Sequence, residues 1–576
     1  MLWFIPLLCL LLHSVASSCG LPVGPSSPLV VSTSLGKVRG ALVDRQAHRF
    51  TLPFAEPPVG PLRFAAPQPL LSWSSMLDGS KTPSACMQSG DGGRGGNAAS
   101  EDCLYITLYR PSSARSGSNL PVLVWIHGGS FTSGSSTASG LDGSKFASEG
   151  NVLVVFVQYR LGAFGFFHTD STLDEASVNA ESGAHKVPGN QAVRDVVQSL
   201  LFLRDHVAEF GGNPSSITVA GQSSGAHMVR TLLTLPAANS LFHRAILHSD
   251  PSNYGPATAQ ANSMLGKSVA QQLGCGDLAC LRSRSAQDVL QASDNAASML
   301  PQQDGSIPVG EPWRPFLGSY FSQGIESAGS AIRDVIMTTV RNEAGSQVGS
   351  MLQPTAQGAS KIRLDANYGP MSQVDLSAGD ILDMLFNEGR GDILSAQSAY
   401  FAASEHDVDD GLRCSIEEAA TDGLYRCGSW STASRLNLYL AVHHTGMTYP
   451  SNDGNTYCSA GGRVCHEDDI YALFDTHSQS GRGGLSPRQT SYAQELRERW
   501  LSFIKTGDPN TAKHGGWQKA AAGGSGGGGG EGGGQKVQLL QLGSEDDGSS
   551  LIDSVDMGVC HDTWGSAVRF DWQLYQ

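Results

Sequence analysis

The chain has 576 residues, 40% of them hydrophobic, which is enough to bury a large core. Its formal net charge of −15 at pH 7 disfavours binding to nucleic acid, although it identifies no substrate. No stretch after the N-terminal region approaches the roughly 20 consecutive apolar residues of a membrane-spanning helix, so we expect no transmembrane segment.

The first 18 residues are typical of a secretory signal peptide. An apolar run that ends at Leu12 is followed by small residues at Ala16, Ser17 and Ser18, which suits cleavage near Ser18. The alternative is a buried N-terminal helix. We therefore predict a secreted, extracellular protein with one domain over residues 19–576.

The cysteines indicate a disulfide framework. Of eleven cysteines, Cys9 belongs to the signal peptide, and ten is an even number for a chain in an oxidising compartment. Proximity in the sequence suggests the pairs Cys86 with Cys103, Cys275 with Cys280, Cys414 with Cys427, and Cys458 with Cys465. Cys19 and Cys560 either pair with each other or Cys19 stays free. No cysteines or histidines have the spacing of a zinc site, so no metal is expected.

Strand-like runs alternate with a helical segment through the first half of the chain. The runs cover residues 120–126, 152–159, 217–221 and 245–249, and the helical segment covers 190–210. This alternation predicts an α/β fold with a mostly parallel sheet that is covered on both faces. Further on we expect strands at 335–339 and 436–442 and a helix at 492–506. The tract 520–534, nearly all Gly and Ala, predicts a disordered surface loop rather than an interdomain linker.

The pentapeptide Gly221 to Gly225 carries the strongest chemical signal. It has the pattern G-x-S-x-G, it follows the apolar strand-like run, and it precedes a helical stretch, which is the context of a nucleophile elbow. The same pattern occurs at residues 523–527, where Ser525 lies in the glycine tract with no strand before it. Ser223 is therefore the candidate nucleophile.

A second glycine-rich turn follows another expected strand. The run 122–126 ends in His127-Gly128-Gly129-Ser130-Phe131, and glycines after a buried strand let backbone N–H groups point into a cavity. Such donors stabilise the oxyanion that forms during acyl transfer. Gly129, Ser130 and Ser224 are the candidate donors.

Several further motifs resemble those of type-B carboxylesterases and lipases, an α/β-hydrolase family that includes cholinesterases and fungal secreted lipases. The motifs are Phe54–Phe64 (FAEPPVGPLRF), Glu101–Tyr105 (EDCLY), Tyr159–Phe166 (YRLGAFGF) and Phe210–Pro214 (FGGNP), in the order of that family. The resemblance covers nearly all of the mature chain. It implies the α/β-hydrolase fold and hydrolysis of small-molecule carboxylic esters without a cofactor.

The resemblance also implies the partners of the serine. Glu343 lies in Asn342-Glu343-Ala344-Gly345 after the expected strand 335–339 and is the candidate acid, with Asp334 as the alternative. His466, in the run from Val464 to Ile470, is the candidate base. His443 and His444 are alternatives that lack the motif. The expected mechanism passes through an acyl-enzyme on Ser223.

The sequence leaves the substrate open. Gln222 stands where the cholinesterase branch has Glu, and the loop 87–102 has no aromatic residue, so choline esters are not expected. A lipase that acts on acylglycerols and a catalytically inactive adhesion or binding protein on the same fold are the alternatives. We expect the loops 249–259, 301–320 and 394–410 to shape the pocket. The oligomeric state is not predicted.

Overall fold

The computed structural model describes residues 29–44, 46–90, 98–169, 187, 189–252, 257, 259–299, 315, 334–354, 362–364, 372–381, 400, 411–446, 456–460, 462–477, 485–520, 536–545, 548–556 and 560. Within these residues, no helix combines the length and hydrophobicity that crossing a membrane requires. The predicted signal peptide, Cys19, Ser525 and residues 521–534 of the Gly/Ala tract lie outside them. So do most of the loops 301–320 and 394–410 and residues 253–256 and 258 of the loop 249–259.

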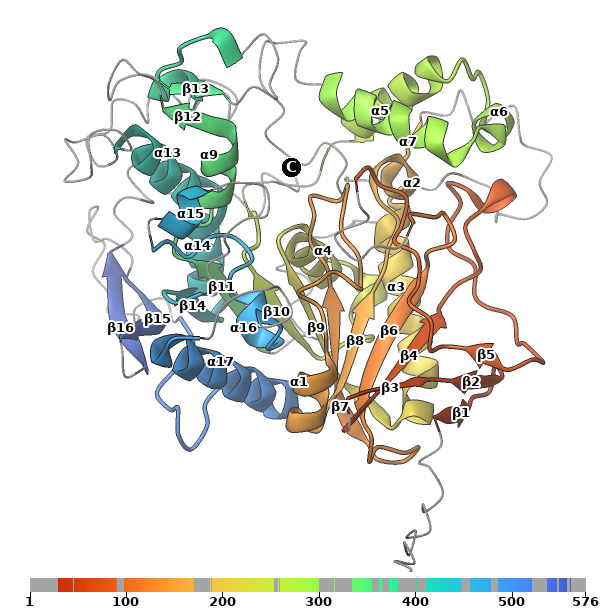
Figure 1. Cartoon of the computed structure of the whole chain (residues 1–576), viewed down its shortest axis with the longest axis horizontal. Helices are drawn as coiled ribbons and strands as arrows, with labels where there is room; N and C mark the ends of the chain where they lie inside the picture. The colour runs from red at the N-terminus through yellow and green to blue at the C-terminus, as the bar shows by residue number, and fades with distance from the viewer. Residues whose placement is uncertain are drawn as a thin grey trace, which may run out of the picture.

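An 11-stranded sheet forms the centre of the molecule (Figure 1). Its order is β16-β15-β14-β11-β10-β9-β7-β8-β6-β4-β3, in which the strands from β15 to β8 run parallel and the outer pairs run antiparallel. The strands are β3 (Ala41–Asp44), β4 (Ala47–Pro53), β6 (Tyr105–Pro111), β7 (Leu120–Ile126), β8 (Leu153–Val157), β9 (Gly212–Gln222), β10 (Arg244–His248), β11 (Asp334–Val340), β14 (Tyr439–His443), β15 (Lys536–Glu545) and β16 (Gly548–Asp556).

Both faces of the sheet are buried, because alternate residues of its central strands contribute to different hydrophobic cores. On β7, Val122, Val124 and Ile126 pack into the core that contains the buried faces of α3 (Gln191–His206) and α4 (Ser224–Leu233). Leu123 and Trp125 pack into the opposite core with α1 (Ser144–Gly150) and α17 (Pro487–Thr506). Continuous apolar runs such as β7 are therefore buried on both sides.

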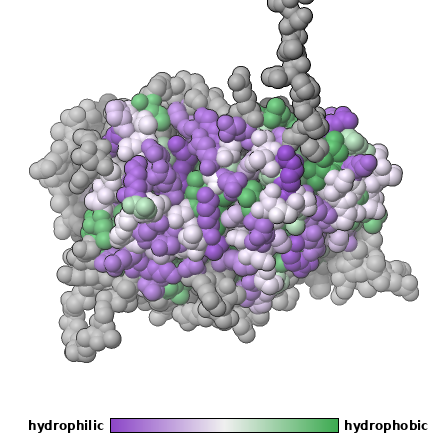
Figure 2. All heavy atoms as spheres, turned by 90° about the horizontal axis from the view of Figure 1, so that it is seen from below, coloured by the Kyte–Doolittle hydropathy of each residue, from purple (hydrophilic) through white to green (hydrophobic). Residues whose placement is uncertain are grey.

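The remaining elements surround this layered centre. Two small sheets pair β1 (Val30–Ser32), β2 (Lys37–Arg39) and β5 (Leu77–Asp78), and β12 (Leu352–Pro354) with β13 (Ile362–Leu364). The other helices are α2 (Gly162–Phe166), α5 (Ala259–Gln272), α6 (Leu278–Ser283), α7 (Ala286–Met299), α9 (Gly345–Met351), α13 (Gly411–Thr421), α14 (Cys427–Leu436), α15 (Thr456–Ala460) and α16 (Ile470–Leu473), with short turns at Gly60–Leu62, Val207–Phe210 and Pro236–Ala238. The face below α17 and the N-terminal strands is mainly hydrophilic, with scattered hydrophobic residues (Figure 2).

The boundaries of three predicted elements differ from the structure for local reasons. The strand expected at 436–442 begins at Tyr439, because Leu436 ends α14 and Asn437 caps that helix in a left-handed conformation, with φ 54°. The helix expected at 190–210 ends at His206 and continues as a tighter turn. The helix expected from residue 492 begins at Pro487, where Ser486 and Gln489 form a capping box.

Three of the expected disulfides are formed, namely Cys86–Cys103, Cys275–Cys280 and Cys458–Cys465. The predicted pairing of Cys414 with Cys427 is wrong, because Cys427 pairs with Cys560 and Cys414 is a free thiol. Helix α13 continues through a π-helical turn (Asp422–Arg426) into α14. Thirteen residues along such a helix span about 20 Å, whereas the Cα atoms of a disulfide lie about 4 to 7 Å apart.

Candidate active site

The candidate nucleophile Ser223 lies in a strained turn between β9 and α4. Its φ of 57° and ψ of −127° are unfavourable for a residue with a Cβ atom. Glycines make the turn possible: a Cβ atom at Gly221 would lie 2.4 Å from the carbonyl oxygen of Gly225, and one at Gly225 would lie 2.2 Å from that of Ile126. Both distances are far below van der Waals contact, so the two glycines of the G-x-S-x-G pattern are steric requirements.

The loop after β7 runs beside this turn. A Cβ atom at Gly128 would lie 3.0 Å from Cβ of Ser223, and the following residues Gly129, Ser130 and Phe131 have positive φ angles of 117°, 52° and 57°. The hydroxyl oxygen of Ser224 accepts a hydrogen bond from the backbone N–H of Phe131 (3.3 Å) and so links the loop to α4.

Three backbone donors are available at this junction. Across the residues that the structure describes, no protein acceptor is bonded to the N–H groups of Gly129, Ser130 or Ser224. Ser224 is the first residue of α4, where N–H groups have no partner within the helix and the helix dipole favours negative charge. This arrangement suits the stabilisation of an oxyanion beside Ser223.

Glu343 and His466 contact each other at the same edge of the sheet. Oε2 of Glu343 lies 2.6 Å from Nδ1 of His466, and Oε1 accepts a hydrogen bond from the backbone N–H of Val340 (2.8 Å). The two loops are held together by backbone contacts, since the N–H of Asn342 donates to the carbonyl of Val464 (2.9 Å). The Glu343 side chain is fully buried, so its carboxylate has a fixed position relative to the imidazole.

The carboxylate determines the protonation of His466. Because an ionised Glu343 only accepts hydrogen bonds, the neutral ring carries its proton on Nδ1 and leaves Nε2 as the basic atom. Burial favours the neutral ring, but the hydrogen bond and negative charge of Glu343 outweigh burial and raise the pKa of His466.

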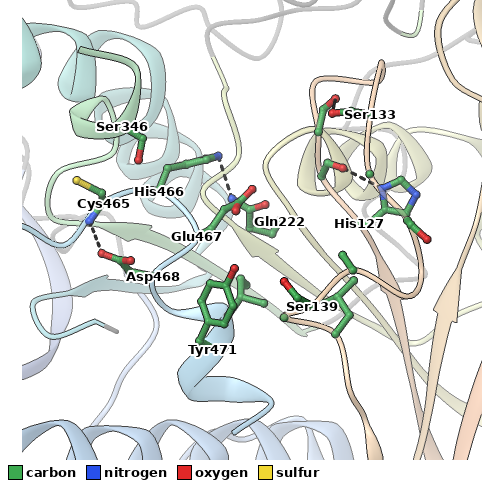
Figure 3. Close-up of a pocket in the computed structure, with 18 of the residues that line it drawn as sticks. His127, Ser133, Ser139, Gln222, Ser346, Cys465, His466, Glu467, Asp468 and Tyr471 are labelled. Atoms are coloured by element: carbon green, nitrogen blue, oxygen red, sulfur yellow. Dashed lines mark hydrogen bonds between the residues drawn. The ribbon is translucent and has the colours of Figure 1, made fainter. Parts of the chain in front are cut away.

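Sequence reasoning missed the partner of Nε2. The side-chain amide of Gln222 lies 2.9 Å from Nε2 of His466, so in the described part of the chain this atom is bonded to Gln222 and not to the hydroxyl of Ser223 (Figure 3). Tyr425, on the π-helical turn, also contacts the imidazole, with ring centroids 5.3 Å apart. The position of Gln222 directly before the nucleophile was the only signal for its role in the sequence.

A cavity of about 510 Å³ opens beside His466 and Gln222. The loop after β7, helix α9, the Cys458–Cys465 disulfide and the segment from His466 to Tyr471 line it. In Figure 3 the side chain of Glu467 extends toward Gln222. Glu467 has a φ of 76°, which is unusual for a residue other than glycine. Gly128 and Gly129 also line the cavity, whereas Ser130, Ser223 and Ser224 do not. A molecule bound there would therefore contact His466 and, of the three candidate donors, Gly129.

A second polar cluster is buried behind the base. Nδ1 of His248 lies 2.6 Å from Asp469, Nε2 of His248 accepts from the indole N–H of Trp500 (3.0 Å), and Nδ1 of His443 lies 2.7 Å from the hydroxyl of Tyr492. The possible metal-ligating atoms of His248, His443 and Asp469 lie within 4.8 Å of one another. Internal hydrogen bonds already engage both ring nitrogens of His248, so a structural network accounts for this cluster.

The alternative residues have other partners. Asp334 lies at the start of β11, where it forms an ion pair with Lys519 (3.1 Å). His443 belongs to the buried cluster, and the backbone of His444 pairs with Leu542 of β15. None of the three contacts His466 in the described structure, whereas Glu343 does.

Comparisons with known proteins agree with this geometry. The model of the carboxylesterase family matches residues 27–525. The chain is 35% identical to the cocaine esterase of Homo sapiens over 527 residues, which cover 88% of this chain and 87% of that protein. It is 27% identical to the acylcarnitine hydrolase of Mus musculus, with 88% of each chain covered. A match to the cocaine esterase of Oryctolagus cuniculus, at 36% identity, spans only about half of that protein (51%).

Solved structures show the same architecture. A carboxylesterase of Geobacillus stearothermophilus superposes with a TM-score of 0.72 at 24% identity and covers 93% of this chain and 99% of its own. A PNB esterase superposes with a TM-score of 0.69 at 25% identity, with 91% and 97% covered. The α/β-hydrolase fold predicted from the sequence is therefore confirmed.

Proposed function

Because the chain belongs to the carboxylesterase family, we propose that it is a secreted serine hydrolase that cleaves carboxylic esters through an acyl-enzyme. Ser223 is the nucleophile, His466 the general base and Glu343 the acid that orients it. The observation that carries this assignment is the 2.6 Å contact between Glu343 and Nδ1 of His466 beside the strained Ser223 turn.

The residues divide the chemistry between them. Nε2 of His466 takes the hydroxyl proton of Ser223 as the oxygen attacks the ester carbonyl, and Glu343 stabilises the imidazolium that forms. The N–H groups of Gly129, Ser130 and Ser224 bind the oxyanion. His466 returns the proton to the leaving alcohol, and water then repeats the attack to release the acid.

The substrate class is a small-molecule ester. Relatives that are named cocaine esterase and acylcarnitine hydrolase support esterase activity in this chain without fixing its substrate. A lipase that acts on acylglycerols is the alternative within the fold. An inactive binding protein is disfavoured, because all the side chains and backbone donors that acyl transfer needs are present.

The test is hydrolysis of p-nitrophenyl esters from acetate to palmitate by the protein purified from culture medium. We expect activity that falls with acyl length, is lost in Ser223→Ala and is retained in Ser525→Ala, the matched serine of the second G-x-S-x-G sequence. A maximum at long chains above the substrate's micelle threshold would indicate a lipase, and a folded wild type without any turnover would contradict the assignment. N-terminal sequencing of the secreted protein tests cleavage near Ser18.

A further inference from the structure

Gln222 is the residue whose position the proposed mechanism does not explain. It ends β9, its side chain is nearly fully buried, and its amide lies 2.9 Å from Nε2 of His466 (Figure 3). Glu343 engages the other ring nitrogen at 2.6 Å. The imidazole is therefore held between a carboxylate and an amide.

Gly128, in the loop after β7, leaves space for the side-chain amide of Gln222. A Cβ atom at Gly128 would lie 2.7 Å from the side-chain oxygen of Gln222 and 2.7 Å from its backbone carbonyl oxygen. Only a glycine at position 128 leaves space for the amide in this place. The same glycine therefore accommodates both Ser223 and its neighbour Gln222.

An amide differs from a carboxylate in what it offers to Nε2. When the ring is neutral, Nε2 carries a lone pair and can accept from the NH₂ group of Gln222. When the ring has taken the proton of Ser223, Nε2 carries hydrogen, and the amide oxygen can accept it after a rotation about the last side-chain bond. A carboxylate only accepts and would therefore stabilise only the protonated ring.

We propose that Gln222 is a positioning residue for Nε2 of His466, an inference that rests on the proposed function. Its NH₂ group donates to Nε2 of the neutral ring, and its oxygen accepts from Nε2–H of the protonated ring. The amide thus engages the base in both protonation states through which the reaction passes. Ser223 displaces the NH₂ group from Nε2 when substrate binds. Once Ser223 has bonded to the acyl carbon, the amide oxygen accepts from the single Nε2–H of the imidazolium and orients the ring until that proton passes to the leaving alcohol.

The charges around His466 explain why a neutral partner matters. Glu343 bonds to the ring from the end of β11, Glu467 directly follows His466 in the chain, and the buried Asp469 lies three residues after His466, next to His248. All three carboxylates favour the imidazolium. A fourth carboxylate at position 222 would hold the base in its protonated form.

Two substitutions test the two properties of the amide. Gln222→Glu keeps the size and the acceptor but adds a charge, so the acid limb of the kcat/KM profile for p-nitrophenyl butyrate should move up by about 1 to 2 pH units. Gln222→Met keeps the approximate volume but removes donor and acceptor, so kcat should fall roughly tenfold at the pH optimum. Gln271→Glu, on the exposed side of α5, adds the same charge away from the site and should change neither quantity.

Melting temperatures of all variants show whether each remains folded, and either substitution at Gln222 is decisive alone. An acid limb in Gln222→Glu that coincides with the wild type, or a wild-type kcat in Gln222→Met, would overturn the role of the amide and leave the esterase assignment intact. A wild type that hydrolyses no ester would overturn both.

Discussion

Replacing Glu343 by Gln is expected to abolish most activity by reversing the tautomer of His466. Oε1 of Glu343 accepts from the backbone N–H of Val340, and this bond will hold the amide oxygen of the new Gln in the same place. The NH₂ group of the Gln then faces Nδ1 of His466, which can only accept from it. The ring proton is forced onto Nε2, the atom that must accept the proton of Ser223.

The size of the effect follows from the charge that is lost. The imidazolium and the carboxylate are separated by roughly 4 Å between charge centres, and at an effective dielectric constant of about 20 their attraction is about 4 kcal/mol. At 1.4 kcal/mol for each factor of ten, this corresponds to about a 10³-fold loss of kcat. Loss of the correct tautomer takes the expected decrease toward 10⁴.

The assay is kcat for p-nitrophenyl butyrate, with active-site titration to count folded enzyme. Glu343→Asp withdraws the carboxylate by one methylene group and should lose about 10²-fold. Glu495→Gln is the matched control, because Glu495 is equally a buried carboxylate but pairs with Arg499 on α17. It should lower the melting temperature and leave kcat within twofold. A loss of less than tenfold in Glu343→Gln would refute the reasoning.

Three further predictions concern stability. Gly225→Ala places a methyl group 2.2 Å from a backbone oxygen of β7 and should cost about 3 kcal/mol of unfolding free energy, whereas Gly276→Ala meets nothing within 4 Å and should cost under about 0.5 kcal/mol in urea titrations. Cys560→Ser opens a disulfide with a sequence separation of 133 and should cost about 5 kcal/mol by the chain-entropy estimate, while Cys414→Ser leaves the disulfide peptide map and the urea midpoint unchanged. Burial opposes ionisation of Asp469, but its histidine partners lower its pKa to about 2. Its contribution of roughly 2 kcal/mol to the unfolding free energy is therefore complete above about pH 4 and should disappear between pH 4 and pH 2. Asp469→Asn should flatten this part of the stability profile in thermal melts, and an unchanged profile would contradict the assignment.

The sequence predicted those parts of the fold and site that depend on local patterns. Continuous apolar runs identified the buried parallel strands, and the G-x-S-x-G pattern correctly predicted that Ser223 lies in a turn between a strand and a helix. The disulfide of Cys427 could not be predicted in this way. Its partner Cys560 is distant in the sequence, and the continuous helix that separates Cys414 from Cys427 becomes visible only in three dimensions.

The partner of Nε2 of His466 likewise could not be predicted from local sequence patterns. Gln222 is adjacent to Ser223 in the chain, yet its contact with His466 spans 244 positions and depends on how β9 and the loop of His466 are placed by the sheet. A role that depends on such a long-range contact can be recognised only in the three-dimensional structure. A role that depends on a turn or on the end of a strand can be predicted from the sequence.

The contacts at the site divide it into two mechanical units. Ser223 and the loop after β7 form one unit, in which Gly225 packs closely against the end of β7. Glu343 and His466 form the other unit, and the backbone hydrogen bond from Asn342 to Val464 joins their loops. Each unit keeps its own internal geometry if the two shift slightly relative to each other. Strand β10, which lies between β9 and β11, and the bond between Gln222 and His466 connect the two units. Substitutions that change the packing of β10 are therefore expected to change the distance between the candidate nucleophile and the candidate base without altering either residue.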